Sequence, residues 1–197
     1  MLSEEPTARG LASGLMIANH GTPVLLELAY ESWYYHLVDL SNKTVNGLMM
    51  PESYFEEFEV GDSTESKVAR TISESDVYEV AGLSGSYGEL HTNKEYMKKT
   101  EFGQPLVQNT LLIVIMEGLF KRVKWEPAII AAYGRDNLRF INPVFIDDTV
   151  NLEMEIVDKE RRDSGGVITM EQRLFKQNDD LAVKGEYLLL VESQSES

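Results

Sequence analysis

The chain has 197 residues, of which 43% are apolar and 26% are charged, as is ordinary for a globular protein with a hydrophobic core. It contains no cysteine, which excludes a disulfide framework, a thiolate nucleophile and a cysteine zinc site and suits the cytoplasm, where we expect the protein. The formal net charge of −15 argues against a nucleic-acid partner, because binding a duplex needs a basic face that displaces counterions.

Residues 1–51 are expected to form an N-terminal extension that is partly helical or poorly ordered. Glu4 and Glu5 stand where a signal peptide would carry basic residues. Thr22 followed by Pro23 is typical of a helix start. The apolar run at 24–40 is interrupted by acidic residues and a histidine, so we predict no transmembrane helix and no membrane partner.

Helices are expected after residue 70. The capping-box pattern SESD at 73–76 and a stop at Gly82 predict a short helix over 74–81. A second capping box, TNKE at 92–95, predicts a short helix that continues to residue 99. The segment 106–120 after Pro105 is apolar on every side, as expected of a helix that is buried all round.

The pattern then changes to that of strands. Residues 152–157 alternate mainly between apolar and acidic side chains, which predicts a strand with one wet face. Two further strands, 167–177 and 181–192, follow turn signals, and 128–133 and 136–142 are interpreted as two more around Gly134. One apolar helix followed by antiparallel strands predicts an α+β fold in which a curved sheet wraps around that helix.

Three stretches resemble landmarks of the MaoC-like (R)-specific enoyl-CoA hydratase and acyl dehydratase family. They are YFEEFEVGD at 54–62, residues 70–112, and LRFINPVFIDDTVNLEMEI at 138–156. The resemblance implies a hotdog domain over 52–192, with a curved antiparallel sheet around one long buried helix, and leaves a polar tail at 193–197. It also implies a homodimer or a higher homo-oligomer, because hotdog subunits commonly join their sheet edges.

The family carries catalysis on a loop reading Gly-Asp-x-Asn-Pro-x-His, and this chain reads GSYGELH at 85–91. By this resemblance His91 stands in the catalytic His position, and an imidazole exchanges protons near neutral pH. Ser86 stands in the Asp position, where a hydroxyl can hold a water but is no strong base. We predict both as catalytic residues and Tyr87 as a substrate contact. Glu89 is either a carboxylate that substitutes for the missing Asp and contacts the substrate, or a solvated charge of the loop.

The start of the long helix is expected to receive the thioester oxygen. Gln108 and Asn109 replace the family's usual His-Gly there, but unpaired backbone N–H groups at a helix N-terminus do not depend on the side chains. The preceding FGQPLVQNT resembles FGxPLVNST of a family branch that also lacks the loop Asp, which favours a specialised dehydratase. We include Gly103 of this segment with Gln108 and Asn109 among the substrate-binding residues.

Other motifs are less informative. The basic clusters at 94–99 and 121–124 are candidates for the coenzyme's phosphates, although solvated helix ends explain each cluster alone more simply. No P-loop, dinucleotide or Gly-x-Ser-x-Gly motif is present, and three scattered histidines predict no metal site.

The leading hypothesis is therefore a hydro-lyase that reversibly hydrates a 2-enoyl-CoA to a 3-hydroxyacyl-CoA and needs no cofactor. Two alternatives stay open. One is a hotdog acyl-CoA thioesterase that uses Glu89, and the other is a non-catalytic acyl-CoA-binding subunit, motivated by Ser86 in place of the Asp.

Overall fold

The computed structural model describes residues 53–162 and 165–194. The expected N-terminal extension, with its predicted helix start at Thr22, lies outside the described residues, as do residues 195–197 of the polar tail. Among the residues that the structure describes, no helix is long and apolar enough to cross a membrane.

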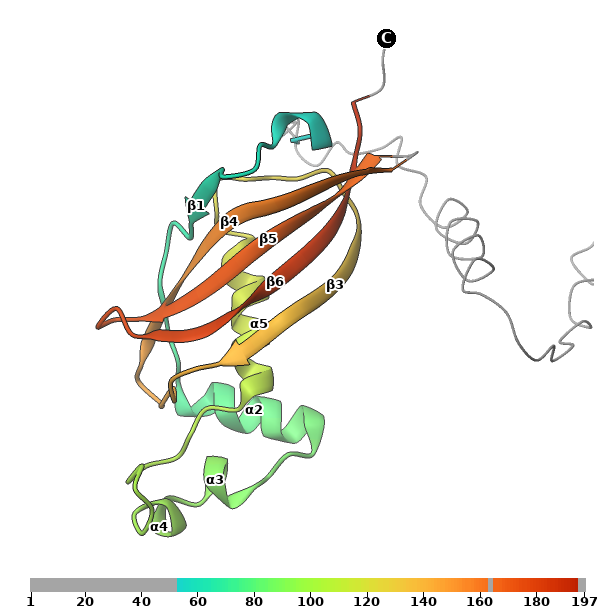
Figure 1. The fold of residues 1–197 in the computed structure, drawn as a ribbon. Helices are drawn as coiled ribbons and strands as arrows, with labels where there is room; N and C mark the ends of the chain where they lie inside the picture. The colour runs from blue at the N-terminus through green and yellow to red at the C-terminus, as the bar shows by residue number, and fades with distance from the viewer. Residues whose placement is uncertain (1–52, 163–164, 195–197) are drawn as a thin grey trace, which may run out of the picture. The chain divides into compact units, whose positions relative to one another are not determined.

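An antiparallel sheet forms the frame of the domain (Figure 1). Its strands are β1 (Ser63–Glu65), β2 (Arg70–Thr71), β3 (Ile129–Phe140), β4 (Thr149–Arg162), β5 (Gly165–Lys176) and β6 (Leu181–Glu192). The strand order is β1-β4-β5-β6-β3, and β2 also pairs with β4. Strand β3 pairs with β6 only, so within the described part of the chain its other edge is free.

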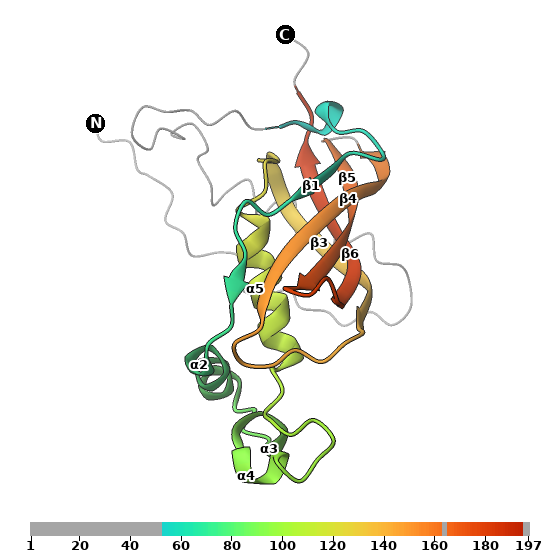
Figure 2. The same cartoon turned by 90° about the vertical axis from the view of Figure 1, so that its left-hand side faces the viewer.

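Helix α5 (Asn109–Phe120) runs along the concave face of the sheet, which curves around it in both views (Figures 1 and 2). Its buried residues join one core with the inward side chains of β4, which include Leu152, Met154 and Ile156, each fully buried. This burial explains the alternation of apolar and acidic residues in 152–157, because one face of the sheet packs on the core and successive side chains of a strand point to opposite faces. The predicted α+β arrangement, a curved antiparallel sheet around one long helix, is confirmed.

Three short helices, α2 (Glu74–Ser84), α3 (Glu89–Thr92) and α4 (Lys94–Met97), lie together beyond one end of the sheet in both views. At the opposite end of the sheet, the 3₁₀ turn η2 (Phe55–Glu57) packs against β5. A Cβ atom at Gly166 would lie 2.2 Å from the Phe55 ring, so this close approach requires glycine. The candidate catalytic loop therefore lies away from the η2 end of the sheet.

Three predicted boundaries of the short helices were wrong. Helix α2 continues past Gly82 to Ser84, because the residue that adopts the left-handed terminating conformation is Gly85, with φ 74°. Helix α4 is capped by Asn93, whose side chain accepts a hydrogen bond from the Tyr96 N–H, and it ends at Met97. The predicted start at residue 92 and end at residue 99 are therefore corrected.

The long helix also differs from its prediction. It begins at Asn109 and not directly after Pro105, because the chain before it is extended: Leu106 forms a bridge with Phe145, and the Val107 N–H donates to the Val144 carbonyl. It is not buried all round, since Val114 is 60% exposed.

The two strands predicted around Gly134 are one strand, β3. Gly134 pairs with Leu188 inside it, and irregular registers on both sides absorb the deviation that was interpreted as a turn. Strands β1 and β2 were not predicted, because two or three residues are too short for a period to be recognised.

Candidate active site

The candidate catalytic loop, residues 85–91, connects α2 to α3. The start of α2 is fixed by a capping box in which the Ser73 hydroxyl accepts from the Asp76 N–H and the Asp76 carboxylate accepts from the Ser73 N–H. After Gly85 the chain turns, and Gly88 caps the single turn of α3, which carries His91.

The His91 ring is tethered to the main chain just before α5. Its Nδ1 lies 2.8 Å from the Leu106 carbonyl oxygen, and the Leu106 N–H donates to the Leu90 carbonyl over 2.9 Å. A carbonyl oxygen can only accept, so Nδ1 carries the proton of the neutral ring and Nε2 keeps its lone pair. The half-buried ring can therefore accept a proton at Nε2 without breaking the tether.

The other loop residues are exposed, and in the described structure none of their side chains is hydrogen-bonded to His91. The Ser86 N–H donates to the Ser84 hydroxyl at 3.3 Å, and Tyr87 is 59% exposed with its hydroxyl near Gly82. The Glu89 carboxylate accepts from the Asn93 side chain at 3.3 Å. Because α3 is helical, residues two apart do not face each other, so Glu89 does not support the His91 ring.

Gln108 links α5 to α2 from a buried position. The residue is only 2% exposed, and its Nε2 donates to the Val77 carbonyl of α2 over 2.9 Å. Its Oε1 is buried and has no hydrogen-bond partner among the described residues. An unpaired buried acceptor is costly, so a donor supplied by a ligand or a water would stabilise this site.

The N-terminus of α5 is open. No side chain caps it, and the first N–H with an acceptor at the helix start is that of Leu112, which donates to the Gln108 carbonyl at 3.3 Å. The N–H groups of Asn109, Thr110 and Leu111 precede this bond and have no acceptor within the helix. With the positive end of the helix dipole, they suit an oxygen on which negative charge develops.

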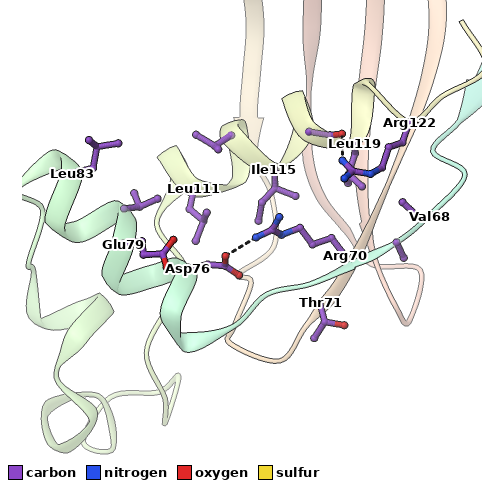
Figure 3. A pocket seen from close by; sticks show the side chains of 14 residues that line it. Val68, Arg70, Thr71, Asp76, Glu79, Leu83, Leu111, Ile115, Leu119 and Arg122 are labelled. Carbon is purple, nitrogen blue, oxygen red and sulfur yellow. Dashed lines mark hydrogen bonds and ion pairs between the residues drawn. The ribbon is translucent and has the colours of Figure 1, made fainter. Parts of the chain in front are cut away.

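A cavity of about 560 Å³, here called the α5 groove, follows one face of α5 between α2 and β2 (Figure 3). Its apolar lining includes Val80 and Leu83 of α2 and Leu111, Ile115 and Leu119 of α5. None of the seven predicted site residues lines it, but it reaches the first turn of α5 through Leu111.

Asp76 is one of the polar residues that line the groove. Burial alone would raise the pKa of its carboxyl group. Hydrogen bonds from Ser73 and the charge and hydrogen bond of Arg70 outweigh that effect and hold the pKa below its usual value. The Arg70 guanidinium lies 2.5 Å from the carboxylate, as the dashed line in Figure 3 marks.

Gly103, with φ 72°, lines a smaller cavity of about 290 Å³ together with Lys94 and Lys98. Both lysines are ion-paired, Lys94 with Glu74 and Lys98 with Glu95, each at 2.6 Å. None of the other six predicted site residues lines this smaller cavity.

Sequence reasoning missed Leu106 and the groove residue Arg70, whereas Arg122 belongs to the basic cluster at 121–124 that was a candidate for the coenzyme's phosphates. Leu106 acts through its carbonyl, which carries no residue-type signal, and the groove depends on how α2 packs against α5. Between residues 53 and 194, with 163–164 left out, no group of three or more His, Asp or Glu side chains is arranged to hold a metal ion.

The chain matches known proteins over most of the described domain. Residues 56–176 match the family model described as a MaoC-like domain. The chain is 33% identical over 144 residues to a MaoC protein from Klebsiella aerogenes, covering 70% of this chain but 39% of that relative's length. It is also 33% identical over 103 residues to an (R)-specific enoyl-CoA hydratase from Rhodospirillum rubrum, covering 52% of this chain and 69% of the relative.

Solved structures have the same fold. A protein from Archaeoglobus fulgidus, described as a monoamine oxidase regulatory protein, superposes with a TM-score of 0.68 at 31% identity, covering 73% of this chain and 97% of that one. A Mycobacterium tuberculosis protein with a double hotdog fold gives 0.65 at 16% identity, covering 74% and 46%. At that identity the second likeness concerns the fold alone, and the expected hotdog fold is confirmed.

Proposed function

We propose, from the premise that this chain belongs to the MaoC-like hydratase and dehydratase family, that it reversibly hydrates a 2-enoyl-CoA to a 3-hydroxyacyl-CoA. The observation that carries the proposal is the tether of His91 Nδ1 to the carbonyl of Leu106, a residue three positions before Asn109 at the open start of α5. This tether leaves the Nε2 of His91 with its lone pair. The (R)-specific enoyl-CoA hydratase among the relatives supports the same reaction class.

In the proposed reaction a water oxygen bonds to the β-carbon of the enoyl thioester, while His91 Nε2 takes a proton from that water. The electron pair of the carbon–carbon double bond moves toward the thioester carbonyl, and the α-carbon receives the proton from His91. One water is thereby added across the double bond, and dehydration is the reverse. Ser86 is assigned to positioning the water, because its hydroxyl can hydrogen-bond it.

The charge that builds up on the thioester oxygen is assigned to the open N–H groups at the start of α5. Donors that are already in place do not have to reorganise during the reaction, which is why such sites stabilise an oxyanion effectively. Asn109 adds a side-chain amide that can donate to the same oxygen, and Gln108 holds the helix start against α2. Tyr87, Gly103 and Glu89 remain predicted substrate contacts.

We further propose that the protein acts in the cytoplasm as a homodimer or a higher homo-oligomer. Strand β3 has a free edge over 12 residues among the described strands, and such an edge favours pairing with another chain. A two-fold pairing of identical edges would close the assembly.

The test is a spectrophotometric assay of the purified full chain with crotonyl-CoA and branched enoyl-CoAs, with free thiol followed in parallel. We expect loss of the enoyl absorbance without thiol release. His91→Ala should lower kcat by roughly 10²- to 10⁴-fold, the usual contribution of a positioned acid or base. A matched control is His91→Gln, which keeps a polar side chain but cannot transfer the proton.

Thiol release would instead assign the chain to the thioesterases. Unchanged turnover in His91→Ala would overturn the role of the imidazole. No turnover with any thioester, together with a raised melting temperature in the presence of acyl-CoA, would indicate a binding subunit.

A further inference from the structure

His91 receives little restraint from the loop that precedes it. Residues 85–88 contain two glycines, Gly85 and Gly88, and the φ of 74° at Gly85 is one that residues with a Cβ atom rarely adopt. Helix α3 is a single turn of four residues, which is too short to be stable without contacts to other elements. The position of the imidazole must therefore be fixed by contacts that α3 makes outside the loop.

Two of these contacts lie on the main chain just before α5. The Leu106 N–H donates to the Leu90 carbonyl over 2.9 Å, and the Leu106 carbonyl accepts from His91 Nδ1 over 2.8 Å. Both contacts end at one residue, and two points fix only an axis, about which α3 could still rotate. A third contact away from Leu106 is needed to stop that rotation.

Tyr78 of α2 supplies such a contact. Its hydroxyl donates to the carbonyl of Thr92, the residue after His91, over 3.2 Å. This carbonyl belongs to the last turn of α3, where main-chain oxygens have no partner within the helix, so an outside donor satisfies it. The Lys94–Glu74 ion pair also joins α4 to α2, but its side chains are 56% and 44% exposed, and exposed pairs contribute little.

The same turn of α2 is bonded to the residue that precedes α5. The carbonyl of Val77, the neighbour of Tyr78, accepts from Gln108 Nε2 over 2.9 Å. The contacts thus close a ring, whose members in order are Leu106, His91, Thr92, Tyr78, Val77 and Gln108. The Tyr78 hydroxyl is the link that removal of a single oxygen atom would open without changing His91 or the start of α5.

We propose that Tyr78 is a positioning residue, whose hydroxyl holds α3, and with it the His91 imidazole, in the orientation that the reaction uses. This rests on the proposed function, because the proton transfer is assigned to His91 Nε2. Tyr78 acts through Thr92 and the main chain of α3 and is assigned no contact with the substrate. Its loss should therefore lower kcat and leave KM unchanged.

The first measurement is the steady-state kinetics of the full chain with crotonyl-CoA. Tyr78→Phe removes only the hydroxyl, and we expect kcat to fall about three- to tenfold, the effect of one hydrogen bond between neutral groups, with KM within about twofold of the wild type. Tyr96→Phe is the matched control, because Tyr96 is 42% exposed like Tyr78 and its hydroxyl has no hydrogen bond among the described residues. It should leave both constants unchanged.

The second measurement does not need turnover. The chain has three histidines, so ¹⁵N-histidine labelling gives few ring signals in NMR spectra, and the signal that His91→Ala lacks is that of His91. The hydrogen-bonded Nδ1–H exchanges with water when the tether opens. We expect this exchange to be about three- to tenfold faster in Tyr78→Phe, because loss of the third contact raises the open population, and unchanged in Tyr96→Phe.

The two measurements together separate positioning from other roles of Tyr78. Unchanged kcat in Tyr78→Phe, a rise in KM in place of the fall in kcat, or an equal loss in Tyr96→Phe would overturn the proposal. A lower kcat with unchanged ring exchange would also overturn it, because the hydroxyl would then act on something other than His91. Faster ring exchange in Tyr78→Phe, together with a wild type that turns over no enoyl-CoA, would retain the hold of Tyr78 on His91 and reject the hydratase function.

Discussion

At the residue scale, Gln108 combines two hydrogen-bonding groups with different roles. Its Nε2 is satisfied by the Val77 carbonyl, whereas its Oε1 is buried without a partner among the described residues. A fold selected only for stability would gain by replacing an orphaned acceptor with an apolar group of similar shape. We infer that the amide is retained because the ligand-bound protein uses it.

The prediction is that Gln108→Met separates stability from activity. The lost bond to Val77 costs about 1 kcal/mol, and removal of the orphaned acceptor recovers about as much, so the free energy of unfolding should change by less than about 1 kcal/mol. The catalytic efficiency should fall at least about tenfold. Urea unfolding and steady-state kinetics measure the two effects, and an active variant with lower stability would assign Gln108 to the scaffold alone.

At the element scale, the start of α2 depends on Asp76. Its carboxylate accepts from the Ser73 N–H and hydroxyl, each at 2.9 Å, and pairs with Arg70 of β2. One side chain thus fixes the helix that leads to the candidate catalytic loop and ties that helix to the sheet. Since these partners favour the ionised form and hold the pKa of Asp76 below its usual value, their contribution must depend on pH.

Asp76→Asn should lower the free energy of unfolding at pH 7 by about 1 kcal/mol, as expected for a weakened cap. A carboxyl group whose pKa is depressed in the folded state stabilises the fold above its unfolded value of about 3.9 and stops doing so as pH falls through the folded value. The difference between wild type and variant should therefore shrink below about pH 4. Thermal unfolding from pH 7 to 3 measures it.

Glu79→Gln is the control for this prediction. Glu79 lies on the same helix and lines the same groove, but its carboxylate has no ion pair among the described residues. The change should alter stability by less than about 0.5 kcal/mol, as is usual for substitutions away from such features. A difference for Asp76→Asn that stays constant down to pH 3 would contradict the assigned ion pair and cap.

Some helices and strands of this domain could be predicted from the sequence, and others could not. Strand β6 was predicted with its bounds, Leu181–Glu192, and the core face of β4 with its alternation, because a long regular period is visible in the sequence. The Asn93 cap and the extended segment before α5 were missed, because local signals compete and tertiary contacts decide between them. Family resemblance, not periodicity, pointed to His91, and neither indicated its Leu106 acceptor.

At the scale of the whole molecule, the sheet ends differently on its two sides. On one side β4 is covered by the short strands β1 and β2, which leave little edge to pair with. On the other side β3 has an unpaired edge in the described structure, with Tyr133 52% and Ile141 50% exposed at or beside it. A long edge with exposed apolar side chains is prone to pair with another chain, so β3 is where we expect the second copy.

The last prediction tests that edge. Tyr133→Lys places a cation on β3, and in a two-fold pairing the same cation comes from the partner copy, so like charges approach each other at the new interface. We expect the dimer dissociation constant to rise at least about tenfold, because such juxtapositions cost more than about 1.4 kcal/mol.

Light scattering over a dilution series measures the dissociation constant. Val60→Lys is the control, because Val60 is 60% exposed and lies outside β3. A variant that dimerises as tightly as the wild type would remove β3 from the interface, and a wild type that stays monomeric at every concentration would reject the assembly.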